Sequence, residues 1–164
     1  VDPLYAPVSP LEVSLALILA AVTRSFLIAI ISILVFSIIV EIHIFNIFYI
    51  FIFGFLSSFI LGSVGFVTGL WAEKFDHTAT VTNFVIAPLS FLSGSFFLID
   101  RLPVFFQTIS SFNPFFYMID GFRYGFLGVS DGSINFGLIY LTFLAFVSWL
   151  LAWYLYKIGY KIKT

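Results

Sequence analysis

The chain has 164 residues, of which 62% are hydrophobic, 21% aromatic and only 9% charged, and its formal net charge is −1. A soluble globular domain carries about 25% charged residues, so this composition excludes a soluble domain and predicts an integral membrane protein. Because the sequence contains no cysteine, disulfides, thiol chemistry and cysteine-ligated metals are excluded as well.

A capping box marks the start of the first predicted helix. Ser9 suits the N-cap, Pro10 suits the first helical position, and Glu12 can return a hydrogen bond to the N-cap backbone. The apolar run continues to Val40, which is longer than the roughly 20 residues that a bilayer requires. Arg24 divides the run, and we expect its side chain to extend back to the headgroups.

The second predicted span, residues 47–71, carries small residues at four-residue spacing. Small side chains four residues apart let two helix backbones approach closely in a membrane. We therefore expect this face to contact protein rather than lipid, either within one bundle or at the seam of a dimer. The residues concerned are Gly54, Ser58, Gly62, Gly65 and Gly69.

The third predicted span, residues 81–99, has a proline in its middle. Pro88 cannot donate a backbone hydrogen bond and should kink the helix. Gly94 belongs to a small and polar stretch that follows it. The apolar sequence is then interrupted before Pro103.

Residues 100–133 contain two apolar pieces, each too short to cross a bilayer. Pieces of about 10 to 14 residues are typical of interfacial or re-entrant helices. The pieces join at Asn113-Pro114, which offers an N-cap and a first-turn proline for the second helix. Gly121, Gly125 and Gly128 would give that helix a thin side.

One charged pair lies on this second short helix. Asp120 and Arg123 are three residues apart and therefore share a helical face, with Tyr117 and Tyr124 close to it. The pair is either a structural ion pair or part of a gate that contacts substrate. The sequence leaves both interpretations open.

The last predicted span, residues 134–156, ends in a belt of tryptophan and tyrosine, as is usual at a membrane interface. Basic residues then favour a cytoplasmic tail, because four spans place five of them inside and two outside. The inner set is Arg24, Lys74, Lys157, Lys161 and Lys163, and the outer set is Arg101 and Arg123.

No catalytic or nucleotide-binding motif is found in the sequence. It has no GxxxxGK[ST] phosphate loop, so the chain cannot bind ATP in the usual way. His43 and His77 fall on opposite sides of the membrane by the expected topology and could not share a metal ion. We therefore expect the chain not to be an enzyme, and to bind no metal or cofactor itself.

The combination of motifs resembles the permease subunits of type-2 ATP-binding-cassette exporters. The residues that carry the resemblance are the kinked segment from Pro88 to Gly94, Leu102-Pro103, Asn113-Pro114, Tyr117 and Arg123. Leu98 is a departure, because many relatives have a second proline there. The start of the chain is also similar to the family's cytoplasmic coupling segment, which implies an ATPase-coupling role for Pro7, Ser9, Pro10 and Glu12.

The resemblance implies a C-terminal portion of a six-span subunit, with two further spans preceding Val1. It implies a bacterial plasma-membrane protein with a cytoplasmic C-terminus. Two such subunits, identical or different, would pair and form the pathway, and each would dock on a separate ATP-binding-cassette ATPase that holds the ATP. The remaining partner would be membrane lipid, with no role for nucleic acid.

The expected fold is an all-α integral membrane protein with about four transmembrane helices and an outer re-entrant helical hairpin between the last two. It forms a single permease domain, 1–164. Its expected parts are a coupling segment (1–12), membrane spans (13–40, 47–71, 81–99 and 134–156), an outer hairpin (100–133) and a cytoplasmic tail (157–164).

Three other functions compete with an ATP-driven permease. An ion-coupled secondary carrier would need acidic or basic groups near mid-membrane. No acidic residue lies within the expected membrane segments, which are residues 25–40, 47–71, 81–99 and 134–156. A non-transporting scaffold would explain the small-residue spacing but not the hairpin. An intramembrane enzyme comes last, because no catalytic residues are present.

Overall fold

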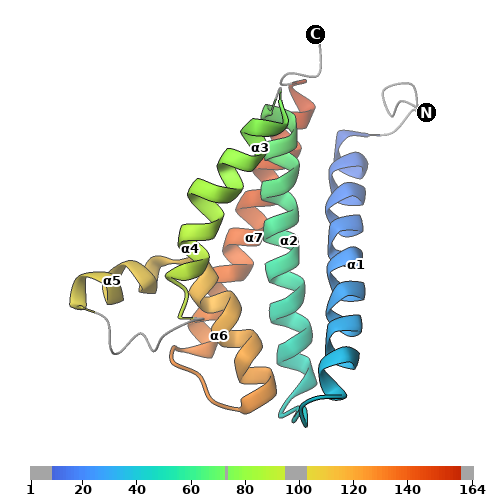
Figure 1. Ribbon diagram of the computed structural model, residues 1–164. Coiled ribbons are helices and arrows are strands. Elements are labelled where there is room, and N and C mark those ends of the chain that lie inside the picture. Colours follow the sequence, from blue (N-terminus) through green and yellow to red (C-terminus); the bar gives the residue numbers. More distant parts are fainter. Residues whose placement is uncertain (1–8, 73, 95–102, 160–164) are drawn as a thin grey trace.

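The computed structural model describes residues 9–72, 74–94 and 103–159, and every regular element in these ranges is helical. Three helices are long and apolar enough to cross a membrane: α1 (Pro10–Ser37), α2 (Ile47–Trp71) and α7 (Ile134–Lys157). They stand side by side, with the start of α1 and the end of α7 at the same end of the bundle (Figure 1). The prediction of an all-α integral membrane protein is confirmed.

The predicted capping box begins α1. The Ser9 Oγ accepts a hydrogen bond from the Glu12 backbone N–H at 3.3 Å, and the Glu12 Oε2 accepts one from the Ser9 backbone N–H at 2.7 Å. These bonds satisfy two backbone donors that a helix start otherwise leaves without partners. The helix ends at Ser37, three residues before the expected end at Val40.

Helix α2 is the centre of the bundle, since it packs against α1, α6 (Pro114–Leu127) and α7. Its N-cap Asn46 accepts a hydrogen bond from the Phe48 N–H at 3.0 Å. The core forms where α2, α6 and α7 meet, and its buried members are Phe53, Leu56, Ile60, Phe116, Tyr117, Met118, Leu141 and Ala145. The outer faces of the long helices expose leucine, isoleucine and phenylalanine, which suits a lipid environment.

The third helical segment differs from the expected span 81–99. It begins at Phe75 and runs through three consecutive elements, α3 (Phe75–Val81), η2 (Thr82–Ile86) and α4 (Ala87–Phe91). The start expected at Val81 is thus six residues too late, because the polar residues 75–80 form a helical turn with Asp76 in its favourable first turn. The end expected at residue 99 lies outside the described residues, and membrane crossing by this segment stays a prediction.

The irregularity predicted at Pro88 takes the form of a π-helical turn directly before it. In η2 the Ala87 N–H donates to the carbonyl of Thr82, five residues back. A proline ring collides with the carbonyl four residues before it and cannot donate a hydrogen bond. The wider π-helical turn relieves that collision. Proline residues and π-helical turns are both recognised causes of helix irregularities. Helix α4 ends before Gly94, whose φ of 80° suits a residue without a side chain.

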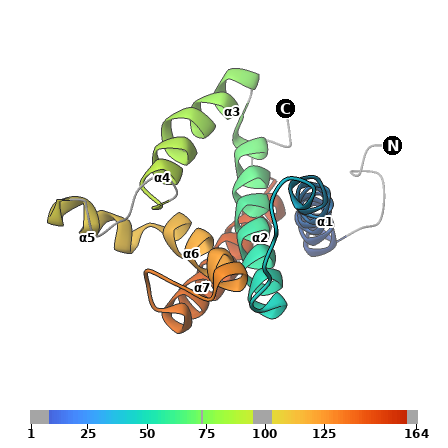
Figure 2. The same cartoon turned by 60° about the horizontal axis from the view of Figure 1, so that its bottom comes forward.

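The hairpin contains the two predicted short helices, α5 (Val104–Phe112) and α6. Asn113 is the N-cap of α6 and accepts a hydrogen bond from the Phe115 N–H at 3.0 Å, while Pro114 occupies the first helical position. Figure 1 and Figure 2 show α5 projecting away from the bundle, whereas α6 lies against α2 and α7.

Candidate functional site

The thin side of α6 lets the hairpin lie directly on α2. A Cβ added at Gly121 would lie 2.2 Å from two ring atoms of Phe53, and one added at Gly125 would lie 2.8 Å from the backbone nitrogen of Ile50. Glycine is therefore required at both positions by the closeness of the two helices. The carbonyl of Gly125 also accepts a hydrogen bond from the Asn46 N–H at 2.8 Å. The hairpin and the start of α2 are thereby joined.

The corner between α5 and α6 is bonded to the end of α4. The Asn113 Nδ2 donates to the Leu89 carbonyl at 2.7 Å, and the Ser110 Oγ donates to the Leu92 carbonyl at 3.0 Å. Asn113 and Ser110 are both buried. Carbonyls at a helix end have no partner within the helix, and leaving them unpaired in an apolar region is costly. Asn113 thus caps the start of α6 and the end of α4 together.

Two tyrosine hydroxyls satisfy the last carbonyls of α5. The Tyr117 hydroxyl donates to the Ser111 carbonyl at 2.9 Å, and the Tyr140 hydroxyl donates to the Phe112 carbonyl at 2.9 Å. Tyr140 belongs to α7, so the corner is bonded to a spanning helix as well. Sequence reasoning found Tyr117 but missed Tyr140. The available signal was a tyrosine within an apolar span, because a hydroxyl in an apolar region needs a partner.

Asp120 is the most connected polar group of the hairpin. Its Oδ1 accepts from the Arg123 Nη2 at 2.8 Å and from the Asp131 N–H at 2.8 Å, and its Oδ2 accepts from the Gly132 N–H at 3.0 Å. Arg123 also pairs with the Asp131 carboxylate. Only 2% of Asp120 is exposed. This carboxylate holds the loop between α6 and α7 in place, which favours the structural interpretation of the pair.

The arginine of this cluster stays charged. Desolvation lowers the pKa of Arg123, but hydrogen bonds to Asp120 and Asp131 outweigh it, and the net pKa lies above the ordinary value for arginine. Asp131 was missed from the sequence. Along one helix, Arg123 and Asp131, which are eight residues apart, would lie about 12 Å from each other, too far for an ion pair, so only the turn after Gly128 brings the two together.

One known protein family matches most of the chain. The model of the ABC-2 type transporter family matches residues 2–127, from before α1 to the last residue of α6. The chain belongs to the ABC-2 type transporter family. The predicted resemblance to a permease subunit of this kind is confirmed.

Two curated relatives illustrate the similarity. The chain is 37% identical over 111 residues to the inner membrane transport permease YadH of Escherichia coli K12, which covers 66% of this chain and 43% of YadH. It is 37% identical over 73 residues to nodulation protein J of Rhizobium leguminosarum bv. viciae, which covers 44% of this chain and 28% of that protein. The chain thus spans less than half the length of the curated relatives that it matches. No solved structure is significantly similar to it.

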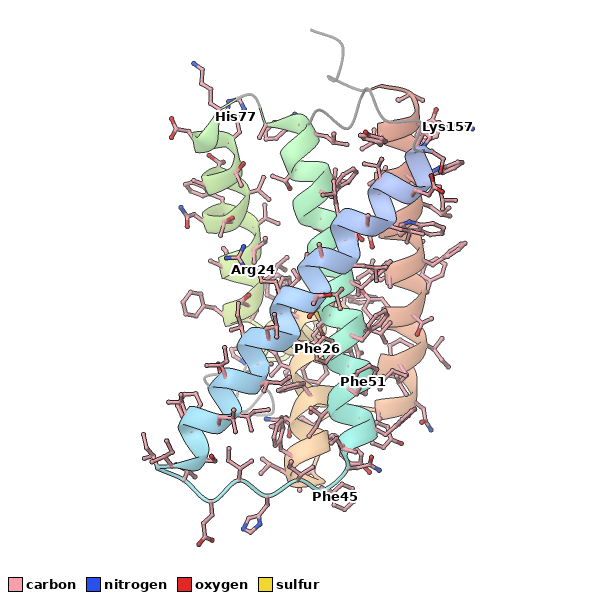
Figure 3. All side chains as sticks on the ribbon, turned by 90° about the vertical axis from the view of Figure 1, so that its right-hand side faces the viewer. Arg24, Phe26, Phe45, Phe51, His77 and Lys157 are labelled. Carbon is pink, nitrogen blue, oxygen red and sulfur yellow. The ribbon has the colours of Figure 1, made fainter. Side chains whose placement is uncertain are left out.

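The small-residue face of α2 in this ABC-2 type chain is only partly covered. Gly54 and Gly62 face neighbouring helices, since a Cβ at Gly62 would lie 3.3 Å from the Cβ of Ala21 on α1. No described atom lies within 4 Å of a Cβ added at Gly65 or Gly69. The reason is that α1 crosses α2 obliquely instead of following it (Figure 3). Packing within the bundle explains the first part of the pattern, and a dimer seam at Gly65 and Gly69 stays a prediction.

The remaining predicted residues lie at the two ends of the bundle. Ser9, Pro10 and Glu12 meet in the capping box of α1, whereas Pro7 lies outside the described residues. Pro103 is exposed at the start of α5. Lys157 and His77 lie at the end of the bundle opposite to Phe45 (Figure 3). Among the described residues, no group of three or more potential ligands could hold a metal ion.

Proposed function

We propose that the full-length protein is the membrane subunit of an ATP-driven exporter. Two such subunits would form the translocation pathway, and each would couple to a separate ATP-binding-cassette ATPase that holds the ATP. The observation that carries the proposal is the match of residues 2–127 to the ABC-2 type transporter family. The chain itself would act as a non-enzymatic permease.

The capped start of α1 is the proposed coupling element. Motion of an ATPase must reach the membrane through a segment that transmits force, and a helix held by a capping box is stiffer than a loop. Helix α1 continues from Ser9 for 28 residues without interruption. Residues 1–12 would therefore contact the ATPase, with Ser9 and Glu12 keeping the helix start intact.

The proposed location is the bacterial inner membrane, by analogy with the inner membrane transport permease YadH. We propose that the hairpin faces outward and that the C-terminus is cytoplasmic. The support is the excess of basic residues that the sequence assigns to the inner side, together with the position of the end of α7, which holds Lys157, opposite to that of α6 (Figure 1). Single cysteines in this cysteine-free chain test it. Labelling at residues 77 and 164 should occur only from the cytoplasm, and labelling at residue 130 only from outside.

The coupling proposal is tested with the full-length protein and an ATP-binding-cassette ATPase, sought among the products of the neighbouring genes. We expect the ATPase to co-purify, and substitution of its phosphate-loop lysine to abolish transport while leaving co-purification unchanged. Dissipation of the proton gradient should leave transport intact. If transport survives loss of the ATPase lysine but stops when the proton gradient collapses, the protein is an ion-coupled carrier and the proposal is wrong.

A further inference from the structure

An apolar groove lies between α1, α2 and α6, in the half of the bundle that contains the hairpin. Its volume is about 640 Å³, and a second hollow of about 380 Å³ continues it. The two share Ala29, Ile33 and Phe122. The described side chains that line the groove or the second hollow are apolar apart from a few serines, and none of them is charged. Two of the serines, Ser25 and Ser57, already donate to carbonyls of their own helices.

The groove exists because α1 separates from α2 halfway along its length. The buried residues of α1 are Ser14, Ile18 and Val22, all in its first half. The helices approach closely where Ala21 meets Gly62. Beyond this crossing, the rings of Phe26 and Phe51 pack at a centroid distance of 5.2 Å and keep the helices apart (Figure 3). The second half of α1 therefore leaves a gap whose floor is α6.

The length of the groove fits a hydrocarbon chain that occupies one leaflet. Along α2 it extends from Ile47, the first residue, to Leu61, just beyond the middle of the helix. That distance is roughly 21 Å at 1.5 Å per residue, so the groove runs from one membrane boundary to about the bilayer centre. A transmembrane helix would continue past the bilayer centre, whereas an acyl chain of one leaflet ends there.

We propose that this groove binds an acyl chain of a membrane phospholipid, drawn from the leaflet on the hairpin side. The chain would lie between the separated halves of α1 and α2 and contact Met118, Ile119 and Phe122 of α6. The open end meets the loop at Ile42, which lines the second hollow between the exposed Glu41 and His43. A zwitterionic headgroup would find groups of suitable polarity there. The bound chain would fill the space between the described parts of α1, α2 and α6 in a region without water.

Photolabelling of the full-length protein tests the proposal. The protein is reconstituted in phosphatidylethanolamine vesicles with a trace of a phospholipid that carries a diazirine midway along one acyl chain. We expect label on Met118 and Ile119 of the groove floor, although only 5% of Met118 is exposed. Ala29→Phe should reduce that label about tenfold, because a phenyl ring would fill a close-packed site. Ala20→Phe, at an exposed position of α1 away from the groove, should leave it unchanged.

The label on exposed Ile139 and Phe143 of α7 provides the internal reference, because these residues face bulk lipid. If Ala29→Phe folds poorly, as shown by its melting temperature, Ser58→Leu fills the same groove from α2. Labelling of α6 that is absent in the wild type, or unaffected by both filling variants, would overturn the proposal. Efficient disulfide-linked dimers of Ala29→Cys would also overturn it, because they would show a second copy in the groove.

Discussion

The close approach of α6 to α2 makes a sharp prediction for Gly121→Ala. The new Cβ would lie 2.2 Å from the Phe53 Cδ1 and Cε1 atoms and 2.4 Å from its Cζ, whereas carbon atoms in contact prefer about 3.5 to 4.0 Å. Phe53 is fully buried and cannot turn away without moving its neighbours. Overpacking costs about 1 to 3 kcal/mol, and the better helix propensity of alanine returns about 1 kcal/mol. A clash this severe lies at the upper end, so we expect a net loss of about 2 kcal/mol.

The measurement is denaturant unfolding of the full-length protein in detergent micelles, followed by circular dichroism. Gly54→Ala is the matched control, because the added Cβ would lie 3.6 Å from its nearest neighbour, an ordinary contact distance, and it should be neutral or stabilising by up to about 1 kcal/mol. Adding Phe53→Leu to Gly121→Ala should recover about 1 kcal/mol if the ring is the obstacle. Equal stability of Gly121→Ala and the wild type would refute the packing argument.

Three further predictions concern the hairpin and the start of α1. Exchanging the charges of Asp120 and Arg123 should not restore the stability that either single substitution loses, because an arginine at 120 cannot accept the hydrogen bonds that two loop N–H groups donate to Asp120. Recovery of the melting temperature in the exchange variant would contradict this. Tyr140→Phe should cost about 0.5 to 1.5 kcal/mol and raise hydrogen exchange at the α5–α6 corner, since it removes the hydrogen bond to the Phe112 carbonyl; unchanged exchange there would argue against the bond. The double substitution Ser9→Ala and Glu12→Ala should weaken the start of α1 by about 1 kcal/mol and lower transport more than membrane insertion. Normal transport with unchanged ATPase co-purification would exclude a coupling role.

The sequence by itself determined the features that depend on local chemistry. Composition specified a membrane protein, the spacing of Ser9, Pro10 and Glu12 specified the start of α1, and Asn113-Pro114 specified the start of α6. Each of these needs only neighbouring residues, because caps and first-turn prolines act within one helical turn. The ion pair of Asp120 and Arg123 was visible for the same reason, as both lie on one helical face.

Tertiary structure alone decided which distant groups meet. Asp131 and Tyr140 became partners of the hairpin only when the chain turned and α7 packed beside it. Gly54, Ser58 and Gly62 repeat every four residues, as do Gly65 and Gly69, yet the oblique course of α1 covers Gly62 and leaves Gly65 exposed. Periodicity in sequence specifies a face of a helix, but the crossing angle of the neighbouring helix decides how much of that face is buried.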